Sequence, residues 1–163
     1  MGLDITAYRK IEKMVEYENR LRDDHFYLVV NSDYPQQADG LIRGFYSCNS
    51  NPFDLEVGSY LGYKLFREKL AKLIGTSCRK IWKNPVPGPF VELINFADND
   101  GTIGPVTSKK LYKDFLDYIP KVQDATGTGF FGNQDDDEFF ISLYQGFMYA
   151  FEIASDGGCV VFH

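Results

Sequence analysis

The chain has 163 residues, the usual length of one domain, so we expect residues 1–163 to form a single domain. Hydrophobic residues make up 44% of the sequence and aromatic residues 16%, which is enough for a core and excludes a disordered chain. The net charge of −6 argues against direct binding to nucleic acid or to an anionic membrane. Because the sequence shows neither a membrane-spanning apolar run nor a secretory signal, we expect a cytoplasmic protein.

Strand signals dominate the first third of the chain. Residues 3–7 alternate apolar and polar side chains and predict a first strand, which we expect to continue to about Lys13. Residues 25–31 are aromatic and β-branched and end at a turn signal, so they predict a second strand. Loop-forming residues fill 31–54, except that 41–48 can form a short strand.

Two helices are predicted in the middle of the chain. Ser59 can cap a helix whose apolar residues recur at helical spacing and which ends at Gly75. Three prolines between 85 and 89 predict an extended connector after this helix. Pro105 suits the first turn of a second helix, which we expect to end at Pro120.

The last third predicts a loop, a third helix and a final strand. Residues 123–134 contain three glycines and are expected to form a loop. The third helix begins at the acidic run from Asp135, ends at the glycines 157 and 158, and precedes a strand at 159–162. The resulting fold class is α+β: a small mixed or antiparallel sheet that includes the N- and C-terminal strands, packed by about three helices.

The cysteines and histidines do not form a recognisable site. Cys48, Cys78 and Cys159 are odd in number and widely spaced, which is typical of reduced thiols rather than of a disulfide framework. With only His25 and His163 to add, the spacing does not suit a closed zinc site. We therefore expect no cofactor, unless acidic side chains hold a divalent cation.

The clearest candidate for such a cation is the segment around Asp98 and Asp100, which is similar to the middle of a calcium-binding loop. If Gly101 is aligned with the loop glycine, Phe96 and Thr107 stand where two acidic ligands are needed. An ordinary Asp/Asn/Gly turn is the favoured interpretation. A Ca²⁺ or Mg²⁺ site of another kind is the alternative.

The second acidic segment contains Asp135 and Asp137. At the start of a helix these carboxylates are favoured by the helix dipole, and a solvated helix terminus is the simpler interpretation. If this segment met the one containing Asp98 and Asp100, the four carboxylates could hold metal ions for phosphoryl chemistry. The sequence does not contain the common phosphate-binding, nucleophile-elbow or zinc-protease motifs.

A third candidate is the stripe formed by Tyr60, Tyr63 and Arg67, which share one face of the first predicted helix. Packing of the arginine across the tyrosine rings is the favoured interpretation. A pocket for an anion or an aromatic small molecule is the alternative.

Four blocks of the sequence resemble, in this order, a group of uncharacterised small proteins encoded by bacteria, phages and prophages. The blocks are MGLDITAY at 1–8, GSYLGY at 58–63 with REKLAKL at 67–73, LINFADNDGTIGP at 93–105 and ASDGGCVVFH at 154–163. This resemblance implies a single domain from a bacterial cytoplasm or a mobile element, and it implies no reaction or ligand.

We therefore expect a non-catalytic module that binds a protein partner through its aromatic and acidic surface. One alternative is a small metal-dependent phosphate-ester hydrolase or nuclease. The other is a small-molecule binding protein.

Overall fold

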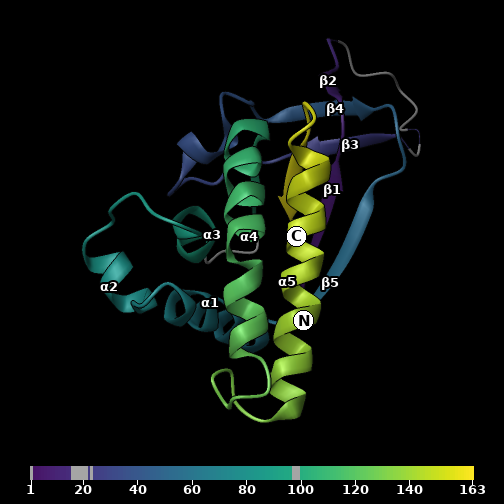
Figure 1. The fold of residues 1–163 in the computed structure, drawn as a ribbon. Coiled ribbons are helices and arrows are strands. Elements are labelled where there is room, and N and C mark those ends of the chain that lie inside the picture. Colours follow the sequence, from purple (N-terminus) through teal and green to yellow (C-terminus); the bar gives the residue numbers. More distant parts are fainter. Residues whose placement is uncertain (1, 16–21, 23, 97–99) are drawn as a thin grey trace.

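The computed structural model describes residues 2–15, 22, 24–96 and 100–163. Two antiparallel sheets lie beside each other, with helices packed on the larger one (Figure 1). Sheet A has the strand order β5-β1-β7-β6, and sheet B has the order β2-β4-β3. The strands are β1 (Gly2–Tyr8), β2 (Ile11–Lys13), β3 (His25–Leu28), β4 (Gly44–Cys48), β5 (Phe53–Ser59), β6 (Gly101–Ile103) and β7 (Cys159–Phe162). The helices are η1 (Pro35–Ala38), α1 (Tyr60–Leu73), α2 (Cys78–Lys83), α3 (Val91–Asn95), α4 (Pro105–Ala125) and α5 (Gln134–Ala154).

The predicted α+β class is confirmed, and so is the pairing of the first and last strands. β1 lies between β5 and β7, and Ile5 stands opposite Phe162 in an antiparallel register. The first strand is shorter than expected, because Lys10 takes a left-handed conformation with φ of 49°. The chain turns there, and β2 joins sheet B instead of prolonging β1.

The main core lies between sheet A and the helices. Leu3, Ile5 and Ala7 are buried on the side of β1 that faces these helices, as the alternation along this strand predicts. In Figure 1, α4 and α5 stand side by side in front of the sheet, and α1 runs crosswise behind the lower half of α4. Phenylalanines from several elements fill the space between these layers. Gly146 allows α5 to lie close to β5, because a Cβ at this position would come within 2.6 Å of the Leu55 side chain.

A second, smaller core lies between the two sheets. Leu28, Tyr46, Cys159 and Val161 are its buried members. Tyr8 stacks on Phe26 across this layer, with ring centroids 3.7 Å apart. The outer face of sheet A is therefore covered by sheet B at the upper end of β1 (Figure 1).

The long helices follow their predicted signals with one exception. Ser59 caps α1 by accepting a hydrogen bond of 3.0 Å from the Gly62 amide, as expected. The exception is α4, which does not end at Pro120 but continues to Ala125. A proline inside a helix removes one backbone donor. The carbonyl that loses its donor is that of Leu116, four residues earlier. The helix continues while it stays packed on α5, and the Tyr144 hydroxyl of α5 donates a 2.6 Å hydrogen bond to the neighbouring Phe115 carbonyl.

Helices α2 and α3 and the strands β5 and β6 were not expected. The alternation of apolar and acidic residues from Phe53 to Val57 was a strand signal for β5, whereas the other three elements are too short for the local pattern to distinguish them from loops. β6 has only three residues and is held by pairing with β7. Within the described ranges, no helix is both long and apolar enough to span a membrane.

Candidate functional site

A pocket opens where α4 is joined to α5, at the lower end of the molecule in Figure 1. It has a volume of about 430 Å³, and we name it the Asp137 pocket. Residues of the connecting loop form one wall, and the first two turns of α5 form the other. Its lining residues are Thr126, Gly127, Gly129, Gly132, Asn133, Gln134, Asp137, Glu138 and Ile141.

Local sequence explains the shape of this loop. Thr126 ends α4 by donating a 2.8 Å hydrogen bond from its hydroxyl to the Val122 carbonyl. Gly127 and Gly129 follow with φ values of 77° and 82°, a left-handed conformation that glycine adopts without strain. Asn133 then starts α5 through a capping box with Asp136. The loop therefore reverses the chain in a few residues and brings its backbone against the side of α5.

Asp137 is the buried charged group of this pocket, with only 6% of its surface exposed. Its Oδ2 accepts a 2.9 Å hydrogen bond from the Gly127 amide across the loop. Its Oδ1 is buried and has no hydrogen-bond partner in the described structure. A buried polar atom without a partner costs about 1–3 kcal/mol, and more when the group is charged. The arrangement therefore has an unused acceptor where a ligand could supply a donor.

The remaining charges around the pocket are negative. Glu138 also lines it, and its Oε1 accepts a 2.9 Å hydrogen bond from Gln134 Nε2. Lys69 lies near this helix start, but its ammonium is 3.3 Å from Asp136, whose oxygens it shares with the capping box. The Asn133 backbone amide and Lys69 together lower the pKa of Asp136. Among the residues that the structure describes, the pocket itself is lined by two acidic side chains and by no basic one.

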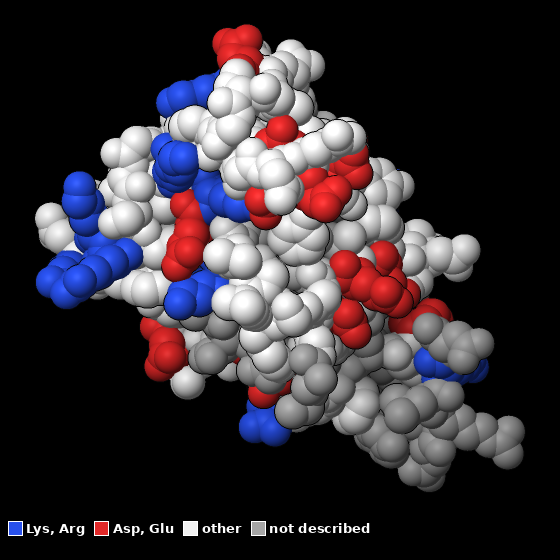
Figure 2. Space-filling view, turned by 90° about the horizontal axis from the view of Figure 1, so that it is seen from below, with Lys and Arg blue, Asp and Glu red and all other residues white. Residues whose placement is uncertain are grey.

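Acidic and basic side chains are also unevenly distributed over the wider surface at this end of the molecule. Figure 2 views the molecule from below, so the loop between α4 and α5 faces the reader. Basic side chains gather at the left edge of this view, and acidic side chains predominate over its centre and right. Such a distribution favours a positively charged ligand near the pocket.

An apolar groove continues from the pocket along the two helices. It has a volume of about 170 Å³, and we name it the α4–α5 groove. Thr126 and Ile141 line both the pocket and the groove, so the two spaces adjoin. The groove is lined by Ile119, Val122, Gln123, Thr126, Ile141, Tyr144, Gln145 and Met148. Together the two spaces offer a charged end and an apolar end to one ligand.

The acidic residues predicted as metal ligands do not form a common site in the described structure. Asp98 lies outside the described residues. Asp100 is exposed, and its carbonyl accepts a 3.0 Å hydrogen bond from Asn31 Nδ2. Asp135 is exposed in the first turn of α5, whereas Asp137 in the same turn points inward. Among the residues that are described, no three His, Cys, Asp or Glu side chains are grouped so that they could hold a metal ion.

The predicted stripe of Tyr60, Tyr63 and Arg67 is divided between core and surface. Arg67 is 5% exposed, its guanidinium carbon lies 4.7 Å from the Tyr63 ring centre, and Nη1 donates to the Ile94 carbonyl at 2.9 Å. The Tyr63 hydroxyl donates a 2.6 Å hydrogen bond to the Phe96 carbonyl, and burial raises its pKa above the usual value. Tyr60 lies on the surface. These contacts are the ones expected if the arginine packs across a tyrosine ring inside the core.

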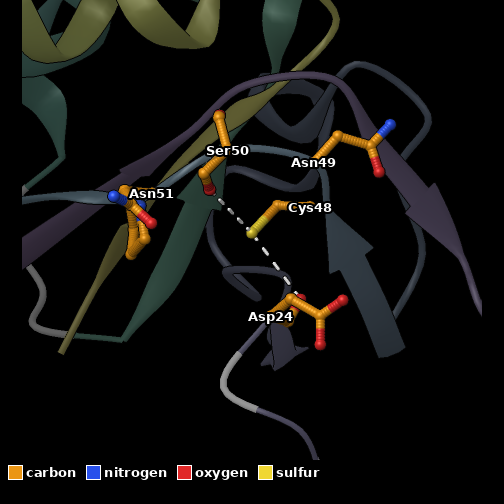
Figure 3. A pocket seen from close by; sticks show the side chains of 6 residues that line it. Asp24, Cys48, Asn49, Ser50 and Asn51 are labelled. Atoms are coloured by element: carbon orange, nitrogen blue, oxygen red, sulfur yellow. Dashed lines mark hydrogen bonds between the residues drawn. The ribbon is translucent and has the colours of Figure 1, made fainter.

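A further pocket, of about 390 Å³, surrounds the end of β4 (Figure 3). The Cys48 thiol lies within it, 3.4 Å from the Ser50 carbonyl oxygen and 3.6 Å from that of Asp24. Burial raises the pKa of this thiol, an effect that the contact with Ser50 partly opposes. A protonated thiol is a weak nucleophile, so the pocket does not have the features of a reactive cysteine site.

Comparisons with known proteins give no match: no family model fits the sequence, and no curated protein or solved structure is significantly similar to the chain.

Proposed function

We propose that this protein is a non-catalytic interaction module that receives a basic side chain of a protein partner in the Asp137 pocket. The observation that carries the proposal is the buried Oδ1 of Asp137, which lacks a donor although the residue lines a pocket. A partner's cation would supply that donor and offset the buried negative charge.

The shape of the site supports a side chain with a polypeptide attached to it. The pocket and the adjoining groove lie on the surface of the α4–α5 pair, where a peptide segment can lie along both. The groove would hold an apolar neighbour of the basic residue. The proposal uses the acidic part of the surface expected from the sequence, through Asp137 and Glu138.

The origin and compartment of the protein also remain proposals. A bacterial cytoplasm, with a phage or prophage source, is supported by the four sequence blocks and by the acidic composition. A partner presenting positive charge agrees with a net charge of −6.

A peptide titration followed by NMR tests the proposal. The probes are pools of acetylated, amidated five-residue peptides with apolar residues around a central residue, which is Lys or Arg in one pool and Glu in the other. We expect the basic pool to shift the backbone amide signals of Gly127 and Asp137, and the Glu pool to leave them unchanged. The same titration with Asp137→Asn should show no shift at these positions.

Asp135→Asn is the matched control, because Asp135 lies in the same helical turn but is exposed and does not line the pocket. It should respond to the basic pool like the unmodified protein. If the basic pool shifts neither amide, or shifts them equally in Asp137→Asn, the proposal is wrong. A titration with MgCl₂ and CaCl₂ that shifts the same amides would favour the metal-site alternative instead.

A further inference from the structure

The contacts of Asp137 allow the two basic side chains to be distinguished. We infer that the residue received by the Asp137 pocket is a lysine rather than an arginine, an inference that rests on the function proposed above. Its Nζ would contact Oδ1 of Asp137 and the carboxylate of Glu138.

The two oxygens of Asp137 differ in their contacts. Arginine binds a carboxylate most strongly through two parallel hydrogen bonds, one to each oxygen. Here Oδ2 already accepts the Gly127 amide at 2.9 Å, and Oδ1 alone has no partner. A guanidinium that pairs with both oxygens would therefore have to share Oδ2 with the Gly127 amide. An ammonium is a compact charge whose three donors can each take a separate acceptor, so one unused oxygen suits it.

Glu138 supplies a second acceptor in the lining of the pocket. It lies one residue further along α5, lines the same pocket, and makes a hydrogen bond with Gln134 through one oxygen, Oε1. An ammonium can thus contact two carboxylates that do not lie in one plane. The torsion that turns an aspartate carboxylate is broad. Because both oxygens turn together about this bond, a large turn would break the contact of Oδ2 with the Gly127 amide. The ammonium would therefore reach Oδ1 by displacing the atoms that now cover it.

The apolar parts of the site suit the lysine stem and its neighbour. Ile141 lies between the pocket and the α4–α5 groove, where it can contact the methylene groups behind the ammonium. The groove beyond it is lined mainly by apolar side chains, including Ile119, Val122 and Met148. A lysine with an apolar neighbour in the same peptide would fill both spaces.

The test separates the two basic pools and measures affinity by calorimetry. We expect the Lys pool to bind the unmodified protein about tenfold more tightly than the Arg pool, since a bidentate pair would have to share Oδ2 with the Gly127 amide. Asp137→Asn should lose the binding, Glu138→Gln should weaken it several-fold, and Asp135→Asn should leave it unchanged. Replacing the apolar flanks of the Lys pool by serine should weaken binding, because the groove would stay empty.

The outcomes separate this inference from the proposed function. Equal or tighter binding of the Arg pool would overturn the choice of lysine and leave the interaction module intact. Binding of neither pool would overturn both. n-Butylamine is the probe for a free amine: if it binds as tightly as the Lys pool, the site serves a small molecule and the lysine of a partner is wrong. A thermal melt of each variant verifies that it is folded at the titration temperature.

Discussion

Two charged side chains are buried among the described residues, Arg67 on α1 and Asp137 on α5, and their surroundings differ in kind. Each has one buried polar atom without a hydrogen-bond partner there, Nε in Arg67 and Oδ1 in Asp137. The guanidinium of Arg67 lies against the rings of Tyr63 and Trp82, and Nη1 donates to a main-chain carbonyl. The carboxylate of Asp137 has one amide contact and a pocket beside it.

The comparison teaches that burial of a charge is not by itself a sign of function. Aromatic faces attract a cation and can stabilise it inside a core by about 2 kcal/mol. An apolar core contains no group that attracts a buried carboxylate in the way that aromatic faces attract a cation. Such a carboxylate depends on hydrogen-bond donors, and Asp137 has one in the described structure. Arg67 is therefore understood as part of the packing, and Asp137 as the residue that a ligand would complete.

The largest effect is expected from Arg67→Ala. This change removes the contacts with both rings and leaves the Ile94 carbonyl without its donor. The free energy of unfolding should fall by about 3 kcal/mol, measured by urea denaturation. Arg67→Met keeps an unbranched apolar stem at the same place and should lose less. An unchanged urea midpoint for Arg67→Ala would mean that this arginine does not stabilise the core. The assignment of Arg67 to the packing would then be wrong.

Tyr63→Phe should have an intermediate effect. The ring and its stacking remain, but the 2.6 Å hydrogen bond to the Phe96 carbonyl is lost inside the core. We expect a loss of about 1–2 kcal/mol in the free energy of unfolding. Tyr149→Phe is a suitable control, because Tyr149 is 50% exposed and water can replace a partner there. Equal melting of the two variants would show that the buried hydroxyl contributes nothing.

Asp137→Asn should have a smaller effect of the opposite sign. The variant removes a buried negative charge, and its amide oxygen can still accept the Gly127 hydrogen bond. We expect the free energy of unfolding to rise by about 0.5–1 kcal/mol, as is common when a binding residue is replaced. Asp135→Asn, made for comparison, should instead lose a few tenths of a kcal/mol through the helix dipole. A clear loss of stability in Asp137→Asn would place this carboxylate with Arg67 as a structural group.

The smallest effect concerns pH and the capping box of α5. The pKa of Asp136 is lowered from 3.8 by the Asn133 amide and by Lys69, so the folded state binds this proton more weakly than the unfolded state. Its contribution to stability is complete above pH 3.8 and is lost as the pH falls through the lower, folded-state pKa. Melting temperatures of the protein and of Asp136→Asn should therefore differ at pH 6 and converge in acid. A difference that stays constant down to pH 2.5 would show that the carboxylate's charge is unimportant.

The sequence predicted the parts of the fold that rest on local signals. The Ser59 cap, the acidic start of α5 and the alternation of β1 all depend on neighbouring residues. The extension of α4 through Pro120 could not be predicted, because the packing partner of this stretch is α5, which lies elsewhere in the chain. The turn at Lys10 is likewise fixed by tertiary contacts, since its amide bonds to the Asp156 carbonyl.

The candidate site was predicted only in part. Asp137 was among the acidic candidates, but its sequence does not distinguish it from the exposed Asp135 two residues earlier. The difference is made by the Gly127 amide, which approaches from the loop. In the sequence Ile141 and Met148 are ordinary apolar helix residues. Only the packing of α4 beside α5 shows that they line a groove. The glycines of the connecting loop were the one signal in this region that could have suggested a pocket.

The position of β7 has a consequence for how the protein is made. This strand lies between β1 and β6 in sheet A, so it joins two parts of the sheet that do not pair with each other. Among the described strands β7 is also the last to leave the ribosome, and until then β1 and β6 each keep an edge that β7 will cover. Unpaired edges favour association between chains. Protection of nascent chains by a chaperone should therefore matter most in the interval before residues 159–162 emerge.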